Sequence, residues 1–144
     1  MKTILFDLDG TLSESRKTIS TEMAHLLEEA AKEFIIGIVS GSDINFISEQ
    51  IEGCFSEEFL DRLLVMPCNG TKKYRYDVSF ELEYAADMIK EIGTEDYAHL
   101  LMNLFREQQS FMMETKVSTS CTGKFFDYRG SMLNWSPVGR DGDE

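Results

Sequence analysis

The stretch Phe6-Asp7-Leu8-Asp9-Gly10-Thr11-Leu12 decides the fold. It continues a short apolar run, residues 3–6, which breaks at Asp7 into a loop containing glycine. A buried parallel β-strand that ends at a functional site has this pattern. A pair of acids is usually a solvated surface feature, but a pair that ends an apolar strand within D-x-D-G-T-L is not. We therefore predict a parallel α/β core with a site at the end of its first strand.

The two carboxylates of this loop are suited to phosphoryl transfer. Asp7 can attack a phosphoryl group to form an aspartyl-phosphate, which divides one hard displacement into two easier ones. Asp9 can protonate the leaving oxygen and then deprotonate the incoming one. Carboxylates and phosphate offer the hard oxygen ligands that Mg²⁺ prefers, so we predict Mg²⁺ as the cofactor.

The pattern outside this loop alternates strands with helices. A helix is predicted from about Ile19, and the continuously apolar run 34–39 predicts a second buried strand. Ser40-Gly41-Ser42-Asp43 follows that strand and opens a helix, where the hydroxyls of Ser40 and Ser42 and the terminal N–H groups suit a phosphoryl group. Further elements are expected, a short helix at 56–62 and a third strand at 63–66. This order predicts right-handed crossovers within one parallel sheet.

The second half of the chain has a different character. Residues 71–84 alternate as a hairpin would, and helical patterns cover 85–92 and 94–113. Two short strands are expected at 124–128 and 132–136. We predict residues 1–80 as the N-terminal part of a phosphoryl-transfer core and 81–144 as part of an α+β second domain. The inward face of the longer helix is predicted to carry Leu100, Leu101, Leu104, Phe105, Phe111 and Met112.

Composition limits the partners. The net charge of −12 argues against nucleic acid or an anionic membrane as a partner, because both select basic surfaces. The three cysteines form no C-x-x-C pair, which favours a reducing compartment over a disulfide framework or zinc site. No apolar run approaches the roughly 18 residues that span a bilayer. We expect a cytoplasmic protein whose histidines, His25 and His99, have no catalytic role.

Two further segments carry a family resemblance. D-x-D-G-T-L followed by the Ser-Gly-Ser strand end resembles the haloacid dehalogenase superfamily. The segment Gly123-Lys-Phe-Phe-Asp-Tyr-Arg-Gly-Ser-Met-Leu-Asn-Trp-Ser-Pro-Val-Gly-Arg140 resembles the cap hairpin of eukaryotic-type phosphomannomutases. Leu12-Ser-Glu-Ser-Arg16, Gly37-Ile-Val-Ser-Gly-Ser-Asp43 and Asn69-Gly-Thr71 are similar to that family in order and spacing.

The resemblance implies a haloacid dehalogenase-like core and an α+β cap, both partial in this chain. It implies Asp7 as nucleophile and Mg²⁺ ligand, and Asp9 as general acid/base whose backbone also binds the metal. It adds three arginines as phosphate contacts, Arg16 in the core with Arg129 and Arg140 in the cap. The implied reaction interconverts mannose 6-phosphate and mannose 1-phosphate through a hexose bisphosphate, which feeds GDP-mannose synthesis. The family also dimerises through its caps, so a homodimer is expected.

Two alternatives stay open. In a sugar-phosphate phosphatase, water would take the aspartyl-phosphate. The chain also stops before the superfamily's core lysine and later acidic metal motif, so we expect a C-terminally truncated product or fragment. Such a chain would be an inactive module that needs a complementary half, because a sheet of three core strands leaves an edge to be covered.

Overall fold

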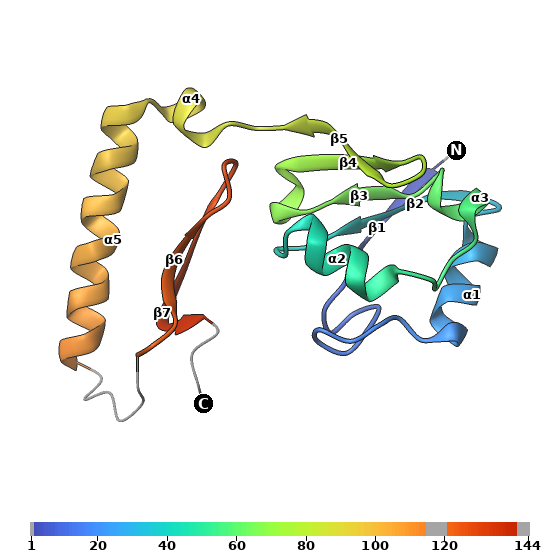
Figure 1. The fold of residues 1–144 in the computed structure, drawn as a ribbon, viewed down its shortest axis with the longest axis horizontal. Coiled ribbons are helices and arrows are strands. Elements are labelled where there is room, and N and C mark those ends of the chain that lie inside the picture. The colour runs from blue at the N-terminus through green and yellow to red at the C-terminus, as the bar shows by residue number, and fades with distance from the viewer. Residues whose placement is uncertain (1, 115–120, 141–144) are drawn as a thin grey trace. The chain divides into compact units, whose positions relative to one another are not determined.

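The computed structural model describes residues 2–114 and 121–140, which divide into two units, Met1–Ala85 and Ala86–Glu144. We call these the N-terminal and C-terminal units. The N-terminal unit contains β1 (Lys2–Asp7), α1 (Thr21–Ala30), β2 (Phe34–Val39), α2 (Ile44–Ile51), α3 (Glu57–Leu60), β3 (Leu64–Met66), a 3-10 turn (Cys68–Gly70), β4 (Lys72–Tyr76) and β5 (Phe80–Ala85) (Figure 1).

One five-stranded sheet forms the frame of this unit, in the order β1-β2-β3-β4-β5. Strands β1, β2 and β3 are parallel, as predicted, and the β4–β5 hairpin continues the same sheet in antiparallel fashion. The parallel register pairs Asp7 with Val39 and Val39 with Met66, so the three carboxyl ends meet at one edge of the sheet. The loops that follow these strands are therefore neighbours.

Helix α1 begins at a side-chain cap. The Ser20 hydroxyl accepts a hydrogen bond from the Met23 amide at 3.2 Å. Helix α2 begins in the same way, since the Asp43 carboxylate accepts from the Ile44 amide at 2.7 Å. Such caps satisfy amides that have no partner inside the helix. The serine loop therefore leads into a helix with a fixed start.

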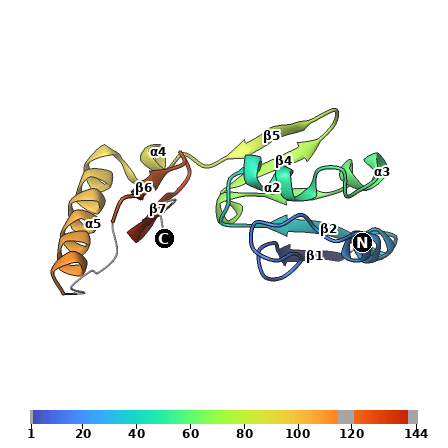
Figure 2. The ribbon, with the colours of Figure 1, turned by 60° about the horizontal axis from the view of Figure 1, so that its bottom comes forward.

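The buried core combines side chains of the sheet with side chains of the helices. Figure 2 shows α2 lying across the sheet. Ile36 and Ile38 alternate on the same face of β2 and are buried in the same cluster as side chains of both α1 and α2. Two crossovers that step in one direction along a sheet place their helices on one side, which explains this arrangement.

Strand β1 corrects one expectation. We predicted a buried strand at residues 3–6, but β1 ends the strand order, and Leu5 is 53% exposed. Within the described residues it pairs only with β2. Leu5 covers Gly37 instead, where an added Cβ would lie 2.6 Å from the Leu5 side chain. Residues 3–6 are as apolar as a buried strand, but among the described residues no strand lies on the side of β1 opposite to β2.

The C-terminal unit contains α4 (Met88–Ile92), α5 (Thr94–Glu114), β6 (Lys124–Tyr128) and β7 (Leu133–Arg140). Strands β6 and β7 form an antiparallel pair. Strand β7 is longer than the predicted 132–136, because Lys124 pairs with Arg140 beyond Pro137. Gly139 permits this extension, since its φ is +89° and an added Cβ would lie 2.7 Å from the Gly123 nitrogen.

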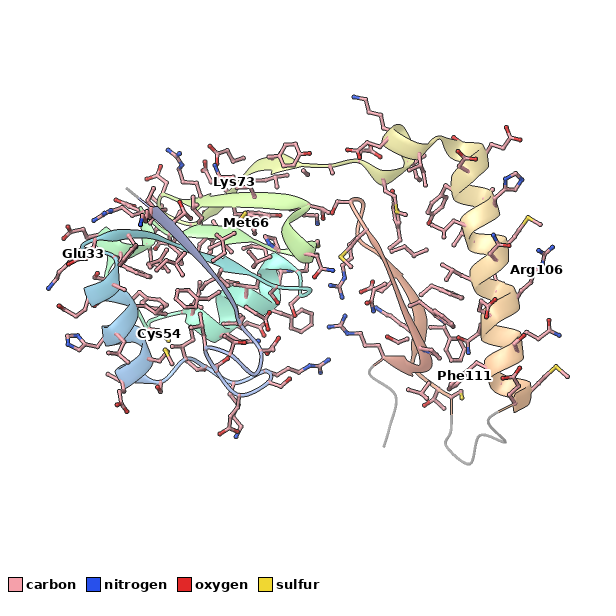
Figure 3. All side chains as sticks on the ribbon, turned by 180° about the vertical axis from the view of Figure 1, so that it is seen from behind. Glu33, Cys54, Met66, Lys73, Arg106 and Phe111 are labelled. Atoms are coloured by element: carbon pink, nitrogen blue, oxygen red, sulfur yellow. The ribbon has the colours of Figure 1, made fainter. Side chains whose placement is uncertain are left out.

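Helix α5 follows the predicted span but not the whole predicted face. Leu100, Leu101, Leu104 and Phe111 are half-buried, whereas Phe105 and Met112 are 57% and 46% exposed, so these two assignments were wrong. Phe105 still contacts the Phe126 ring edge-on at 4.8 Å between centroids. Figure 3 shows Arg106 projecting away from β6 and β7. A single hairpin covers too narrow a strip of the helix to bury all six positions.

Candidate active site

The loop after β1 is closed by its own backbone. The Leu8 carbonyl accepts hydrogen bonds from the amides of Thr11, Leu12 and Ser13, at 3.3, 3.0 and 3.1 Å. The Gly10 amide donates to the Ser13 carbonyl at 2.7 Å, and Gly10 has φ +80°, in the left-handed region that glycine adopts without strain. Leu8 itself is fully buried. The loop therefore holds Asp7 and Asp9 on either side of an anchored residue.

The two aspartates have different surroundings. Asp7 ends β1 and is exposed, and its Oδ2 lies 3.5 Å from the Thr11 hydroxyl, which donates to it. Asp9 is half-buried, and its Oδ1 accepts from the Arg16 amide at 2.8 Å and from Gln50 Nε2 at 3.2 Å. An accessible carboxylate thus lies beside a fixed one, which is the arrangement a nucleophile and an acid/base partner require.

The serine loop lies next to the aspartate loop. Ser40 follows Val39, the residue paired with Asp7, so the sheet brings these two predicted segments together. Ser40 is buried, and its Oγ accepts from the Ser42 amide at 3.1 Å. Ser42 is half-buried. The Ser40 hydroxyl therefore shapes the loop, while Ser42 is the more accessible of the two.

The loop after β3 braces the serine loop. The Ser40 amide donates to the Met66 carbonyl at 3.2 Å, and the Asn69 amide donates to the Ser40 carbonyl at 2.8 Å. The Cys68 amide donates to the Ser42 carbonyl at 3.0 Å. Cys68 and Asn69 adopt positive φ values of 54° and 57° to make these contacts. Hydrogen bonds thus connect the loops that follow β2 and β3 at one edge of the sheet.

A cation that the sequence did not assign lies near this edge. Lys72, the first residue of β4, has its Nζ 3.6 Å from Asp43 Oδ1 and only 15% of its side chain exposed. Asp43 is the cap of α2 and directly follows Ser42. The structure therefore places a positive charge against the start of the helix that the serine loop opens.

Arg16 is the one predicted arginine that belongs to this unit. Its backbone has φ +58°, and its amide is one of the two donors to Asp9. The guanidinium carbon lies 6.0 Å from the centroid of the Phe46 ring, at the outer limit of a cation–π contact. Its side chain is exposed. Arg16 therefore both anchors the acid through its backbone and presents a cation at the surface.

The other two arginines lie in the C-terminal unit and are separated along the hairpin. Arg129 follows the last residue of β6, and its Nε and a terminal nitrogen lie 2.9 and 2.8 Å from Asp127 Oδ2. Arg140 pairs with Lys124, the first residue of β6. Five residues at about 3.3 Å each place the two backbones roughly 16 Å apart. The structure does not bring them together through the backbone.

The donor set fits a magnesium ion. The described residues hold no cluster of three or more His, Cys, Asp or Glu side chains around a common point. Mg²⁺ does not require one, because it commonly uses one or two carboxylates and completes its shell with water and substrate phosphate oxygens. Asp7 and Asp9 flank one turn and supply carboxylate and backbone carbonyl oxygens there. These are the residues that would hold the ion.

Gln50 is a second residue that sequence analysis did not assign to the site. It lies on α2 and is 4% exposed. Its signal was weak, since a glutamine one position from Ile51 and three from Ile47 shares their buried stripe, where a polar side chain needs a partner. That partner lies 41 residues away in sequence, at Asp9. No local pattern indicates which loop α2 faces.

The fold of this chain is haloacid dehalogenase-like. A haloacid dehalogenase-like hydrolase from B. subtilis aligns with a TM-score of 0.54 at 22% identity, over 74% of this chain and 34% of that one. A Plasmodium falciparum IMP-nucleotidase aligns with a TM-score of 0.61 at 12% identity, over 92% of this chain and 39% of that one. At these identities the likeness establishes the fold alone, and the predicted fold class is confirmed.

The family follows from the sequence relatives. A family model for eukaryotic phosphomannomutase matches residues 23–144. A phosphomannomutase of Encephalitozoon cuniculi is 36% identical over 97% of this chain and 51% of its own length. Phosphomannomutase 1 of Homo sapiens is 33% identical over 94% of this chain and 48% of its own. The chain belongs to the eukaryotic phosphomannomutase family, and it spans about half the length of the curated relatives it matches.

Proposed function

We propose that this protein acts as a phosphomannomutase, interconverting mannose 6-phosphate and mannose 1-phosphate through a hexose bisphosphate and so feeding GDP-mannose synthesis. The observation that carries the proposal is the pairing of an exposed Asp7 with an anchored Asp9 at one end of β1, in a chain of this family. Residues 1–80 act as part of the phosphoryl-transfer core and 81–144 as part of the cap. The division of the chain after Ala85 supports this assignment.

The proposed chemistry follows from the different surroundings of Asp7 and Asp9. Asp7 attacks the phosphorus, and its carboxylate forms the new O–P bond as the bond to the sugar oxygen breaks. Asp9 gives its proton to that oxygen and recovers one from the hydroxyl that attacks next. Bound Mg²⁺ would lower the cost of bringing carboxylates and phosphate together. Ser42 and the amides at the start of α2 bind phosphate oxygens, with Ser40 shaping that loop.

The arginines bind the phosphates of the sugar by charge. Arg16 presents its guanidinium beside the aspartate loop. The Arg129 guanidinium is paired with Asp127 and has only 5% of its side chain exposed, and Arg140 ends β7. A guanidinium fork matches phosphate oxygens in pairs, which a lysine does not. A cavity of about 420 Å³ lies along residues 10–20, but neither aspartate and none of these arginines lines it.

The test is conversion of mannose 1-phosphate in the presence of Mg²⁺ and a hexose bisphosphate, with mannose 6-phosphate measured as product. We expect Asp7→Asn to lower the rate of conversion by a factor on the order of 10³ or more, because no carboxylate remains to carry the phosphoryl group. Asp77→Asn, in the exposed turn between β4 and β5, is the matched control and should keep wild-type rates. Release of inorganic phosphate without isomerised sugar would select the phosphatase alternative. Absence of both products would refute the proposal for this chain.

We propose a homodimer formed through residues 81–144, in the cytoplasm, by analogy with the family. In the described part of the chain, no helix combines the length and apolar character needed to cross a bilayer. Sedimentation equilibrium gives the mass of the intact chain and of a chain that lacks residues 86–144. The same ratio of measured mass to monomer mass in both chains would contradict a dimer formed through residues 81–144.

A further inference from the structure

A partly buried ion pair lies at the start of the helix that the serine loop opens. Lys72 Nζ lies 3.6 Å from Asp43 Oδ1, with 15% of the lysine side chain and 34% of the aspartate side chain exposed. In the antiparallel register Tyr74 pairs with Val65, so Lys72, two residues earlier on β4, lies level with the end of β3. The pair therefore belongs to the sheet edge where the aspartate and serine loops lie.

Asp43 has two opposite effects on the serine loop. Its Oδ1 accepts from the Ile44 amide at 2.7 Å, which fixes the start of α2. Its negative charge stands directly after Ser42, where the proposed function requires phosphate oxygens to bind. Like charges repel more strongly the less water lies between them, and this carboxylate is partly buried. The cap that orders α2 therefore opposes the binding of an anion beside it, unless a cation balances its charge.

Lys72 is the cation that lies against this cap. We propose that Lys72 is a positioning residue, which neutralises Asp43 so that the serine loop can bind the phosphate of the sugar. This inference rests on the proposed function and deepens it. Lys72 acts through Asp43, because it balances the charge of the carboxylate and leaves the cap of α2 in place.

The neighbouring lysine has a different partner. Successive side chains of a strand point to opposite faces of the sheet. Lys73 Nζ lies 2.7 Å from Glu83 Oε2 on β5, and a terminal nitrogen of Arg75 lies 3.6 Å from the other oxygen of that carboxylate. Two adjacent residues of β4 thus carry the same charge but balance different acids, which makes Lys73 a matched control for Lys72.

The first test removes each lysine charge in turn. Lys72→Met and Lys73→Met keep most of the aliphatic side chain and change the net charge of the protein equally. The readout is the affinity for inorganic phosphate in EDTA, so that bound metal does not contribute, followed by the ¹⁵N NMR shifts of the Ser42 and Ile44 amides. We expect Lys72→Met to weaken phosphate binding about 5- to 20-fold and Lys73→Met to weaken it by less than about 2-fold.

A second pair of variants separates charge balance from a structural role. Asp43→Asn removes the charge but keeps a side-chain oxygen that can cap α2. Adding Asp43→Asn to Lys72→Met should restore phosphate affinity to within about 2-fold of wild type, and Lys72→Arg alone should preserve it. A lysine that only joined β4 to α2 would not be rescued in this way, because the double variant also lacks the ion pair.

The kinetics of mannose 1-phosphate provide a third readout. Lys72→Met should raise the KM by the same factor as it weakens phosphate binding and should change kcat by less than about 3-fold, because the phosphate stays bound throughout the reaction. A wild-type chain that binds phosphate without converting the sugar would refute the proposed function, and the phosphate affinities would still decide the role of Lys72.

Three results would overturn the inference. Equal phosphate affinities in Lys72→Met and Lys73→Met would show that the charge of Asp43 does not act on the anion. A double variant that binds phosphate as weakly as Lys72→Met would make the lysine a structural residue. Amides of Ser42 and Ile44 that do not respond to phosphate in the wild-type chain would show that the serine loop binds no phosphate for Lys72 to favour.

Discussion

The two units are held together by different kinds of side chain. In the N-terminal unit the buried cluster is apolar and draws on strands and helices alike, with Leu8, Ile38, Ile47 and Val65 at 0% exposure. Among the described residues of the C-terminal unit, the buried residues are Gln108 and Ser131, and every apolar side chain is at least partly exposed. One unit therefore depends on hydrophobic burial and the other on hydrogen bonds between half-buried elements.

Gln108 shows how the second kind of packing works. Its Oε1 accepts from Trp135 Nε1 at 2.8 Å, and its Nε2 donates to the Pro137 carbonyl at 2.9 Å. These bonds join α5 to β7 at one point and leave much of the apolar face of the helix only half covered. The comparison teaches that polar contacts fix how elements meet, whereas the depth of burial sets how much stability their meeting supplies.

The largest expected effect comes from cutting into the apolar core. Ile38→Ala should lower the free energy of unfolding of the N-terminal unit by about 2–5 kcal/mol, since it opens a cavity at a fully buried site. Leu104→Ala on half-buried α5 should cost the C-terminal unit only about 1 kcal/mol. Hydrogen exchange read segment by segment measures both values. Equal losses would break the comparison.

An intermediate effect is expected at Gln108. Gln108→Ala leaves the Trp135 N–H and the Pro137 carbonyl without their partner, which should cost about 1–3 kcal/mol. Because Trp135 is the only tryptophan, its fluorescence reports denaturation of this unit directly. Gln109→Ala, one position along on the exposed side, is the control. Matching denaturation midpoints for the two variants would show that the polar contact does not hold the unit.

The smallest effect concerns a surface contact of the N-terminal unit. Glu28 accepts from the Ser56 amide and hydroxyl, each at 2.8 Å, and the amide and then the hydroxyl hold the pKa of Glu28 below its ordinary 4.5. A folded pKa below the unfolded one adds stability above pH 4.5, and this stability is lost as pH falls through the folded value.

Glu28→Gln should therefore destabilise the unit at pH 7 by less than about 1 kcal/mol, because the pair is largely exposed and screened. The difference in free energy of unfolding between Glu28→Gln and wild type should close as the pH is lowered below 4.5. Chemical denaturation at each pH measures this difference. Glu33→Gln, at an exposed position, is the control. A gap that stays constant down to pH 2 would contradict the assignment.

Local signals predicted most elements because the determining residues are adjacent in sequence. The apolar run 34–39 became β2 over the same residues. The helices predicted from about Ile19 and after Ser40-Gly41-Ser42-Asp43 begin at Thr21 and Ile44. Strand β7 was predicted too short because Pro137 and Gly139 look like strand breakers. The register with β6, a pairing across the hairpin, overrides them.

The site residues also fall into two groups, those that local sequence signals indicate and those that depend on contacts distant in sequence. Asp7, Asp9 and Ser40 could be placed together because they follow strands that must be neighbours in a parallel sheet. Gln50 could not be, since its contacts with Ser13 and Asp9 span 37 and 41 residues and depend on how α2 lies over the loop. The exposure of Leu5 was missed for a related reason, because an apolar strand looks the same in sequence at the edge of a sheet as at its centre.

Within residues 2–114 and 121–140, no strand pairs with the outer side of β1, which has a consequence for handling the protein in solution. The backbone amides and carbonyls on this side are a template on which a second molecule can add a strand. The exposed apolar side chain of Leu5 favours such association. Mutual repulsion from a net charge of −12 opposes such growth, and added salt screens it within about 10 Å at 0.1 M. The colloidal lifetime of the chain should therefore shorten as ionic strength rises, the reverse of ordinary salting-in.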